Sequence, residues 1–236
     1  MNKYGTLYGI GVGPGDPELI TVKGKKVLES ISCVFTPVAG QDKTSIAYSI
    51  AKRYVSPAAR VERLFFPMTP DRMVCEKAWE DHAGKIARVL EQGTDAAFIT
   101  LGDPMTYSTY GYLLKKMEML YPAVRSVTIP GIPSYLAGAA SANLSLAEGS
   151  EILAIIPGAT PEARIREFLG SSDTVVFLKH NSNTQSIRVL LQEMGLQDRA
   201  TYVRRLGFPD EMITKDDDQD LPDRGDYLSL IIVKKQ

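Results

Sequence analysis

Long apolar runs and an excess of positive charge are both missing from this chain of 236 residues. No run approaches the roughly 20 apolar residues that a membrane-spanning helix needs, so we expect no association with a membrane. The first residues, MNKYGTLYGIGVG, lack the pattern of a signal peptide, and we expect a cytoplasmic protein. The formal net charge is −1, so no broad positive field would attract nucleic acid.

Cysteine and histidine are also scarce, with two of each. Cys33 and Cys75 have neither a CxxC spacing nor a metal-ligand spacing, so we expect both to be reduced and structural. His82 and His180 are far apart in the sequence, and nothing else assembles into a metal site. We therefore expect no protein-bound metal.

What is present is a regular alternation of apolar strands with amphipathic helices. The expected strands are 4–10, 32–38, 61–66, 96–100, 124–129, 151–156, 174–178, 200–206 and 227–233. The expected helices are 22–31, 44–54, 71–91, a helix after 104, one entering at 134, 160–169 and 183–194. This order predicts an α/β protein with a mostly parallel sheet, closed by antiparallel members. The break at Tyr121-Pro122 predicts two domains, 1–121 and 122–236.

The central stretch is AAFITLGDPMTYSTYGYLL, residues 96–114. A buried strand, 96–100, turns sharply through Leu101-Gly102-Asp103-Pro104 and enters an aromatic helix. Ligands of open α/β sheets bind outside the carboxyl ends of strands, where this turn falls. Glycine allows close approach of the backbone, and proline stiffens the turn. Gly-Asp-Pro is also common turn chemistry, so alone the stretch is equally consistent with an ordinary corner.

The glycine-rich loop after the first strand does not match the dinucleotide-binding fingerprint G-x-G-x-x-G. Counting from Gly9, the sixth position is Pro14, and counting from Gly11 it is Asp16. The second strand reads CVFTPV and ends without the acidic residue that holds a ribose. No Gly-Lys-Ser/Thr follows either, which excludes a P-loop. A nicotinamide-dependent dehydrogenase is therefore a poor interpretation.

Three loops, GVGPGDPELIT at 11–21, LGDPMTYST at 101–109 and PGIPS at 130–134, together resemble those of the tetrapyrrole methylase family. The closing strand YLSLIIVKK extends the resemblance over essentially the whole chain. Membership would imply two α/β domains of the class III methyltransferase type, with S-adenosyl-L-methionine in the cleft between them. It would also imply a homodimer.

Within the family the sequence looks most like the enzymes that methylate precorrin-2 or cobalt-precorrin-2 at C(20). The finer match lies in Phe66-Pro67-Met68-Thr69-Pro70-Asp71, in the helix containing Trp79, and in GDPMTYSTYGYL. The uroporphyrinogen-III methylases have a Tyr-Asp pair at the end of the second strand, where this chain has Phe35-Thr36-Pro37. That departure disfavours a role in sirohaem synthesis.

The resemblance also implies a set of cofactor contacts. Carried over by motif, these are Pro14, Leu101, Gly102, Asp103, Thr106, Pro133, Ser134, Lys179 and Gly207. Lys179 stands where relatives often have methionine, so we expect a contact through its backbone rather than its side chain. Corners rich in Gly and Pro suit a ligand that is held by backbone amides and carbonyls.

The implied reaction is attack of an electron-rich meso carbon on a sulfonium methyl group, which mainly requires alignment of the reactants. A base must then accept the meso proton. Asp16, Asp103 and Tyr107 are the candidates, and the sequence does not rank them, although Asp103 is better placed to orient the cofactor. His180 follows a strand end and is expected to be a surface residue, with a metal-facing or carboxylate-facing role as the alternative.

A polycarboxylate substrate should meet local positive charge. We expect Lys43 and Arg53 to contact it, from a pool that also contains Lys23, Lys25, Lys26, Arg60 and Arg63. The stretch 211–226 carries seven acidic residues and is expected to be a solvated loop away from the site.

Two other interpretations stay open. One is a methylase of the same fold that acts at another corrin position, or on protein or RNA. The other is a non-catalytic tetrapyrrole-binding or carrier module.

Overall fold

The computed structural model describes residues 4–40, 44–180, 183–215 and 227–235. These residues divide into two compact units, Met1–Pro133 and Ser134–Gln236. Each unit contains one five-stranded sheet. Two α/β units are what the sequence predicted.

The first unit is built from five strands and four helices within the described residues. Its strands are β1 (Thr6–Gly11), β2 (Cys33–Val38), β3 (Arg60–Phe65), β4 (Ala96–Thr100) and β5 (Arg125–Ile129). Its helices are α1 (Val22–Ser30), α2 (Ile46–Ala51), α3 (Arg72–Leu90) and α4 (Thr109–Leu120), with a short 3-10 turn, η1 (Pro17–Leu19). The strand order is β3-β2-β4-β1-β5, and all neighbouring strands are parallel.

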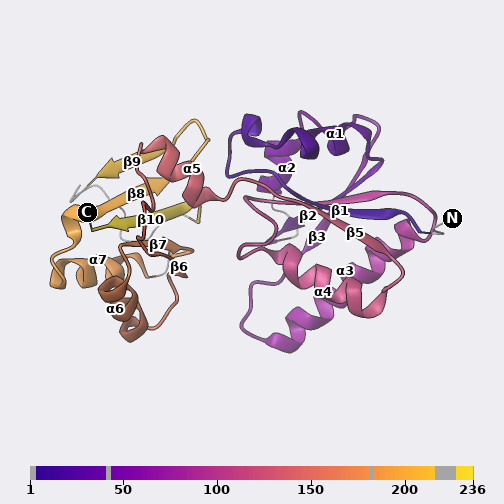
Figure 1. Cartoon of the computed structure of the whole chain (residues 1–236). Coiled ribbons are helices and arrows are strands. Elements are labelled where there is room, and N and C mark those ends of the chain that lie inside the picture. The colour runs from indigo at the N-terminus through magenta and orange to yellow at the C-terminus, as the bar shows by residue number, and fades with distance from the viewer. Residues whose placement is uncertain (1–3, 41–43, 181–182, 216–226, 236) are drawn as a thin grey trace. The chain divides into compact units, whose positions relative to one another are not determined.

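Helices cover both faces of this sheet, with α1 and α2 on one face and α3 and α4 on the other (Figure 1). One hydrophobic core lies under α3 and α4, where Phe98, Tyr110 and Leu113 are fully buried. The neighbours β1 and β4 send the chain to opposite faces, through α1 and α4 respectively. Such a switch in direction between neighbouring parallel strands leaves a crevice outside their carboxyl ends.

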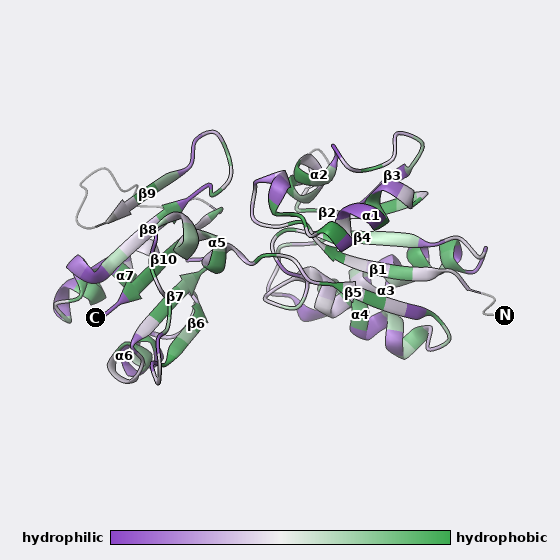
Figure 2. Ribbon diagram, turned by 45° about the horizontal axis from the view of Figure 1, so that its top comes forward, coloured by the Kyte–Doolittle hydropathy of each residue, from purple (hydrophilic) through white to green (hydrophobic). Residues whose placement is uncertain are grey.

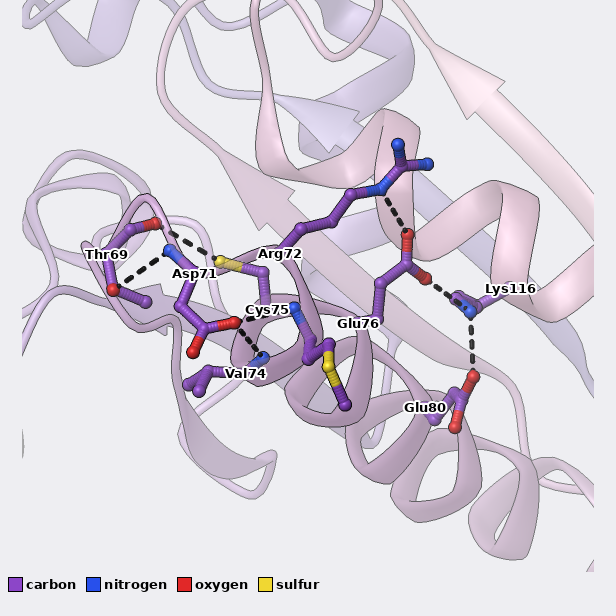
Figure 3. A network of polar contacts seen from close by, with 9 residues as sticks. Thr69, Asp71, Arg72, Val74, Cys75, Glu76, Glu80 and Lys116 are labelled. Carbon is purple, nitrogen blue, oxygen red and sulfur yellow. Dashed lines mark hydrogen bonds and ion pairs between the residues drawn. The ribbon is translucent and has the colours of Figure 1, made fainter.

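Side-chain caps fix where the first unit's helices begin. Thr21 Oγ1 accepts a hydrogen bond from Gly24 N at 3.1 Å, as its place before α1 predicted. Asp71 Oδ1 accepts from Met73 N at 2.9 Å, so the motif that precedes Trp79 serves as the N-cap of α3. Figure 3 shows this cap beside Thr69 and Cys75.

The same figure shows how α3 and α4 are joined. Lys116 of α4 forms ion pairs with Glu76 at 2.6 Å and with Glu80 at 2.8 Å (Figure 3). Trp79 stacks on Tyr112 of α4, with ring centroids 4.4 Å apart. The residues that carried the finer resemblance therefore hold two helices together.

The second unit has five strands and three helices in its described part. Its strands are β6 (Leu153–Pro157), β7 (Thr174–Leu178), β8 (Ala200–Arg204), β9 (Met212–Lys215) and β10 (Ser229–Lys234). Its helices are α5 (Ser134–Ser141), α6 (Glu162–Ser171) and α7 (Thr184–Glu193), with a short 3-10 turn, η2 (Gln197–Arg199). The order is β6-β7-β10-β8-β9, with β6 and β7 parallel and the other pairs antiparallel.

In this unit α6 and α7 pack on one face of the sheet and α5 on the other (Figure 1). Alternation along β10 explains the division, because Ile231 and Val233 join the core under α6 and α7. Leu230, one residue earlier, lies beside Gly138 of α5. Figure 2 shows α4 and α7 carrying both hydrophilic and hydrophobic residues, as helices with one buried face should.

Two expectations about the fold need correction. The predicted domain boundary after residue 121 is early, because β5 pairs in parallel with β1 and so belongs to the first unit. The stretch 211–226 is not simply a loop either, since β9 pairs with β8 at the edge of the second sheet. Residues 216–226 lie outside the described residues. No helix in the described part has both the length and the apolar character that a membrane span requires.

Candidate active site

Three loops of the first unit meet where β1, β4 and β5 end. Gly102 N donates to Gly13 O at 2.8 Å, and Gly13 N donates back to Gly102 O at 3.2 Å. Val12 N also donates to Thr100 O at 2.9 Å, which continues the pairing of β1 with β4. The sequence predicted a ligand corner here, and the structure brings the first and second of the three motif loops into direct contact.

The third loop approaches so closely that only glycine fits. A Cβ on Gly131 would lie 2.1 Å from Gly102 O, and a Cβ on Gly11 would lie 2.5 Å from the same oxygen. We call Gly11, Gly13, Gly102 and Gly131 the glycine junction. Gly11 and Gly131 were not among the predicted site residues, although both stand within the motif loops.

Gly102 differs from the other members of the junction in the space around it, although Gly13 shares its left-handed backbone with a φ of +75°. The φ of Gly102, +67°, is a backbone conformation that glycine adopts freely and other residues adopt at a cost. A Cβ placed there would have no neighbour closer than 3.9 Å, the nearest being Pro133 Cα. Gly102 thus presents open backbone beside Pro133, as a ligand held by main-chain groups requires.

Asp103 fixes the geometry of two of these loops. Its Oδ2 accepts a hydrogen bond from Gly131 N at 3.1 Å. Its Oδ1 accepts from Met105 N at 2.9 Å and from Thr106 Oγ1 at 3.4 Å. Both carboxylate oxygens therefore hold backbone or side-chain donors of the site, and Thr106 is drawn to the same corner.

The other two candidates for the base, Asp16 and Tyr107, lie on the first and second motif loops. Asp16 Oδ1 accepts from Glu18 N at 2.8 Å and caps η1. Tyr107 has a φ of +49°, which is uncommon for a residue with a side chain, and its side chain is exposed. Of the aromatic group, Tyr110 is instead core, with its hydroxyl 3.2 Å from Thr128 Oγ1.

The other residues that were predicted to contact the cofactor lie partly in the first unit and partly in the second. Pro14 is buried next to Gly13, and Leu101 precedes Gly102 in the central turn. Ser134 begins α5 in the second unit, directly after Pro133. Lys179 and Gly207 also belong to the second unit, where they follow β7 and β8.

A family model described as Tetrapyrrole (Corrin/Porphyrin) Methylases matches residues 6–222. This chain is a tetrapyrrole methylase. Two curated relatives match over nearly their whole length. A probable cobalt-precorrin-2 C(20)-methyltransferase of Methanocaldococcus jannaschii is 38% identical, covering 100% of this chain and 99% of the relative. The cobalt-precorrin-2 C(20)-methyltransferase of Salmonella typhimurium is 33% identical, covering 98% of this chain and 97% of the relative.

A solved structure supports the fold of this tetrapyrrole methylase. A cobalt precorrin-4 methyltransferase superposes with a TM-score of 0.70 at 25% identity, covering 97% of this chain and 94% of the other. The family and the two-unit α/β architecture expected from the sequence are therefore confirmed. Among the described residues no group of three or more His, Cys, Asp or Glu side chains is arranged to hold a metal ion.

His180 is not the surface residue that was expected. It is 2% exposed, with Nδ1 at 2.9 Å from Thr184 Oγ1 and Nε2 at 3.2 Å from Ser229 Oγ. Burial lowers the pKa of His180 to about 4, so its ring is neutral at physiological pH. A neutral ring whose two nitrogens both meet hydroxyls adds no charge for a substrate carboxylate.

The two residues expected to bind substrate find no support either. Lys43 lies outside the described residues. Arg53 follows α2 and stacks over Tyr54, with Cζ 5.1 Å from the ring centroid. The chain after α2 returns to the amino ends of the strands, where Arg60 N donates to Ser32 O at 2.9 Å. Arg53 therefore lies toward the amino ends of the strands, away from the glycine junction.

Proposed function

We propose that this tetrapyrrole methylase transfers a methyl group from S-adenosyl-L-methionine to C(20) of precorrin-2 or cobalt-precorrin-2. The observation that carries the proposal is full-length identity of 38% and 33% to two enzymes named for that reaction. Identity to the cobalt precorrin-4 enzyme is lower, at 25%. The glycine junction supplies the ligand corner that such a transfer needs.

The residues of the first unit fit the cofactor. Open backbone at Gly102, with the space of a Cβ free beside Pro133, suits a ligand that lies against main-chain atoms. Pro14, Leu101 and Thr106 are the other cofactor contacts that the resemblance implies in this unit. Ser134, Lys179 and Gly207 are those that it implies in the second unit. When bound, S-adenosyl-L-methionine supplies an electrophilic methyl group on a positively charged sulfur.

We assign Asp103 a positioning role. Its two oxygens accept hydrogen bonds from Gly131 N and Met105 N and so hold the loops in place. Asp16 and Tyr107 remain the candidates for accepting the C(20) proton, and Tyr107 is the more exposed of the two. Alignment of the meso carbon with the methyl group is then the main catalytic contribution of the loops.

Two further properties belong to the proposal. We propose a homodimer, as the resemblance implies, and a cytoplasmic location. Size-exclusion chromatography with light scattering tests the first, and fractionation of the source cells tests the second.

The decisive experiment supplies purified protein with S-adenosyl-L-methionine and precorrin-2. We expect S-adenosylhomocysteine and a product that carries one additional methyl group, which carbon NMR locates at C(20). A methyl group at another carbon would place the protein among the other methylases of this fold. Binding of precorrin-2 without turnover would indicate a carrier. Parallel rates on metal-free and cobalt-loaded precorrin-2 identify the preferred substrate.

A further inference from the structure

The carboxyl ends of β7 and β8 lie at the same edge of the second sheet. Both strands run antiparallel to β10, so they are parallel to each other. Leu178 and Val203 both pair with Leu230, one from each side. Lys179, Arg204 and Arg205 follow these two residues and therefore flank the first residues of β10. We call these three residues the cationic edge.

Two members of the cationic edge have a backbone conformation that favours glycine. Lys179 has a φ of +54° and Arg205 a φ of +50°. Side chains disfavour this region sterically, and non-glycine residues held there tend to mark functional sites. Glycine does occupy the next left-handed position, Gly207, with a φ of +76°. Lysine and arginine thus occupy positions at which glycine would be unstrained. This indicates that their side chains have a function.

Arg204 points to the opposite face of the sheet from α5. Val203 and Leu230 lie beside Gly138 of α5, so alternation directs Arg204 and its partner Ser229 to the other face. The Arg204 Nε atom is buried and has no hydrogen-bond partner among the described residues. A guanidinium has five N–H donors, and a buried donor without an acceptor is costly. Arg204 therefore retains capacity for an anionic acceptor.

The edge already holds one carboxylate of its own. Arg205 Nε contacts Asp210 Oδ2 at 2.5 Å, and its guanidinium stacks over Phe208, 5.1 Å from the ring centroid. The pKa of Asp210 is lowered, first by the hydrogen bond from Arg205 and further by the charges of Arg205 and Arg204. This shows that the field of the edge stabilises a carboxylate.

A second acidic side chain is turned toward the backbone. Glu211 Oε2 accepts a hydrogen bond from Gly207 N at 2.6 Å. The first residue of the acidic stretch, Glu211, therefore lies beside the edge. His180, which follows Lys179 in the sequence, is neutral and adds no charge to the edge.

We propose that the cationic edge, formed by Lys179, Arg204 and Arg205, is a carboxylate-binding site of the second unit. The inference rests on the proposed function for the identity of its ligand. That ligand is a carboxylate either of the tetrapyrrole substrate or of the amino-acid portion of S-adenosyl-L-methionine.

The test uses the full chain with two variants of the edge and one matched control. Arg204→Gln removes the charge at the carboxyl end of β8, and Arg199→Gln removes an exposed charge before the amino end of the same strand. Lys179→Gly removes the charge and also relieves the left-handed backbone, so this variant should fold at least as well as the wild type. Calorimetry gives the Kd for S-adenosylhomocysteine, and initial rates give the KM for precorrin-2.

We expect both edge variants to weaken one of these two constants by about tenfold, as loss of a hydrogen bond to a charged group does. A rise in KM alone identifies the tetrapyrrole carboxylates, and a rise in the Kd identifies the cofactor carboxylate. Arg199→Gln should match the wild type.

Unchanged constants in Lys179→Gly and Arg204→Gln would overturn the inference, as would an equal effect of Arg199→Gln. Should Arg204→Gln fold poorly, Lys179→Gly decides alone. A wild-type protein that neither binds S-adenosylhomocysteine nor methylates precorrin-2 would instead refute the proposed function, and the edge proposal with it.

Discussion

Asp103 and Gly131 are joined by a hydrogen bond of 3.1 Å, although 28 positions separate them in the sequence. The bond runs from the Gly131 N–H to Asp103 Oδ2 and ties the turn after β4 to the turn after β5. The same carboxylate holds Met105 N through its other oxygen, at 2.9 Å. One side chain thus sets the mutual position of two of the three motif loops.

Replacing Asp103 should weaken cofactor binding without altering the pH dependence of catalysis. Asp103→Ala removes the acceptors for Gly131 N and Met105 N, and we expect the Kd for S-adenosylhomocysteine to rise about tenfold or more. Calorimetry measures this change. Because Asp103 positions the loops, the residual kcat/KM should keep the wild-type pH profile.

Asp95 provides the matched control, because its Oδ1 accepts from Thr6 N at 2.6 Å at the amino ends of β1 and β4. Asp95→Ala should lower stability and leave the Kd for S-adenosylhomocysteine unchanged. Loss of one limb of the pH profile in Asp103→Ala would show that Asp103 moves the proton itself.

Two glycines of the junction should respond differently to the same substitution. Gly131→Ala forces a Cβ to within 2.1 Å of a backbone oxygen, and we expect a loss of stability of about 2 kcal/mol or more. Gly102→Ala meets no atom within 3.9 Å, so its backbone strain should cost only about 1 kcal/mol of stability. The added methyl group would occupy the ligand's space and weaken S-adenosylhomocysteine binding.

Thermal unfolding and calorimetry separate the two effects. Gly111 lies within α4 with no atom within 4 Å of an added Cβ, so Gly111→Ala should raise stability by roughly 0.5–1 kcal/mol. If Gly102→Ala binds S-adenosylhomocysteine like the wild type, the open backbone at that position is not part of the site.

Much of the fold followed from local pattern. The strands at 96–100 and 174–178 were predicted to the residue, because each is a continuous apolar run bounded by turn residues. The boundary between the units was missed because the polar strand β5 follows the Tyr121-Pro122 break and so looks like the first strand of a second domain. The pairing of β5 with β1 joins segments that are distant in the sequence, so no local window of residues contains it.

The site residues also divide into those that local sequence predicts and those that depend on contacts between distant segments. Gly102 and Asp103 could be predicted from Gly-Asp-Pro after a buried strand. The need for glycine at position 131 could not be predicted, because a Cβ there would clash with the carbonyl oxygen of Gly102, which is distant in the sequence. The place of Arg53 could not be predicted, because it depends on the path of the chain after α2, which returns to the amino ends of the strands. The predicted contact of Arg53 with the substrate is untested.

His180 should make the protein less stable in mild acid. Its pKa in the folded protein is about 4 against an ordinary 6.5, so the unfolded chain takes up the proton first as pH falls. Stability is complete above about pH 6.5 and declines toward pH 4, by up to about 3 kcal/mol for this group.

Urea unfolding at pH 7 and pH 5 measures the decline. His180→Gln lowers stability at pH 7 but should flatten the dependence on pH. Burial also lowers the pKa of His82, so His82→Gln should flatten the remaining slope. A His180→Gln protein with the full wild-type slope would show that His180 is not the group responsible.

Arg53 should be dispensable for substrate binding. Arg53→Glu reverses a charge that lies toward the amino ends of the strands, so we expect the KM for precorrin-2 to stay within about twofold, as exposed pairs are weak. A clear rise in KM for precorrin-2, together with a changed salt dependence of that KM, would show that the substrate binds at the face of the first unit that carries Arg53.

The central claim is methyl transfer to C(20), and labelled turnover tests it most directly. Protein is incubated with precorrin-2 and S-adenosyl-L-methionine that carries a carbon-13 methyl group, and the product is examined by NMR. We predict one labelled methyl group, bonded to the meso carbon C(20), and an equal amount of S-adenosylhomocysteine. A label at any other carbon, or no S-adenosylhomocysteine from a protein shown to be folded, would contradict the account.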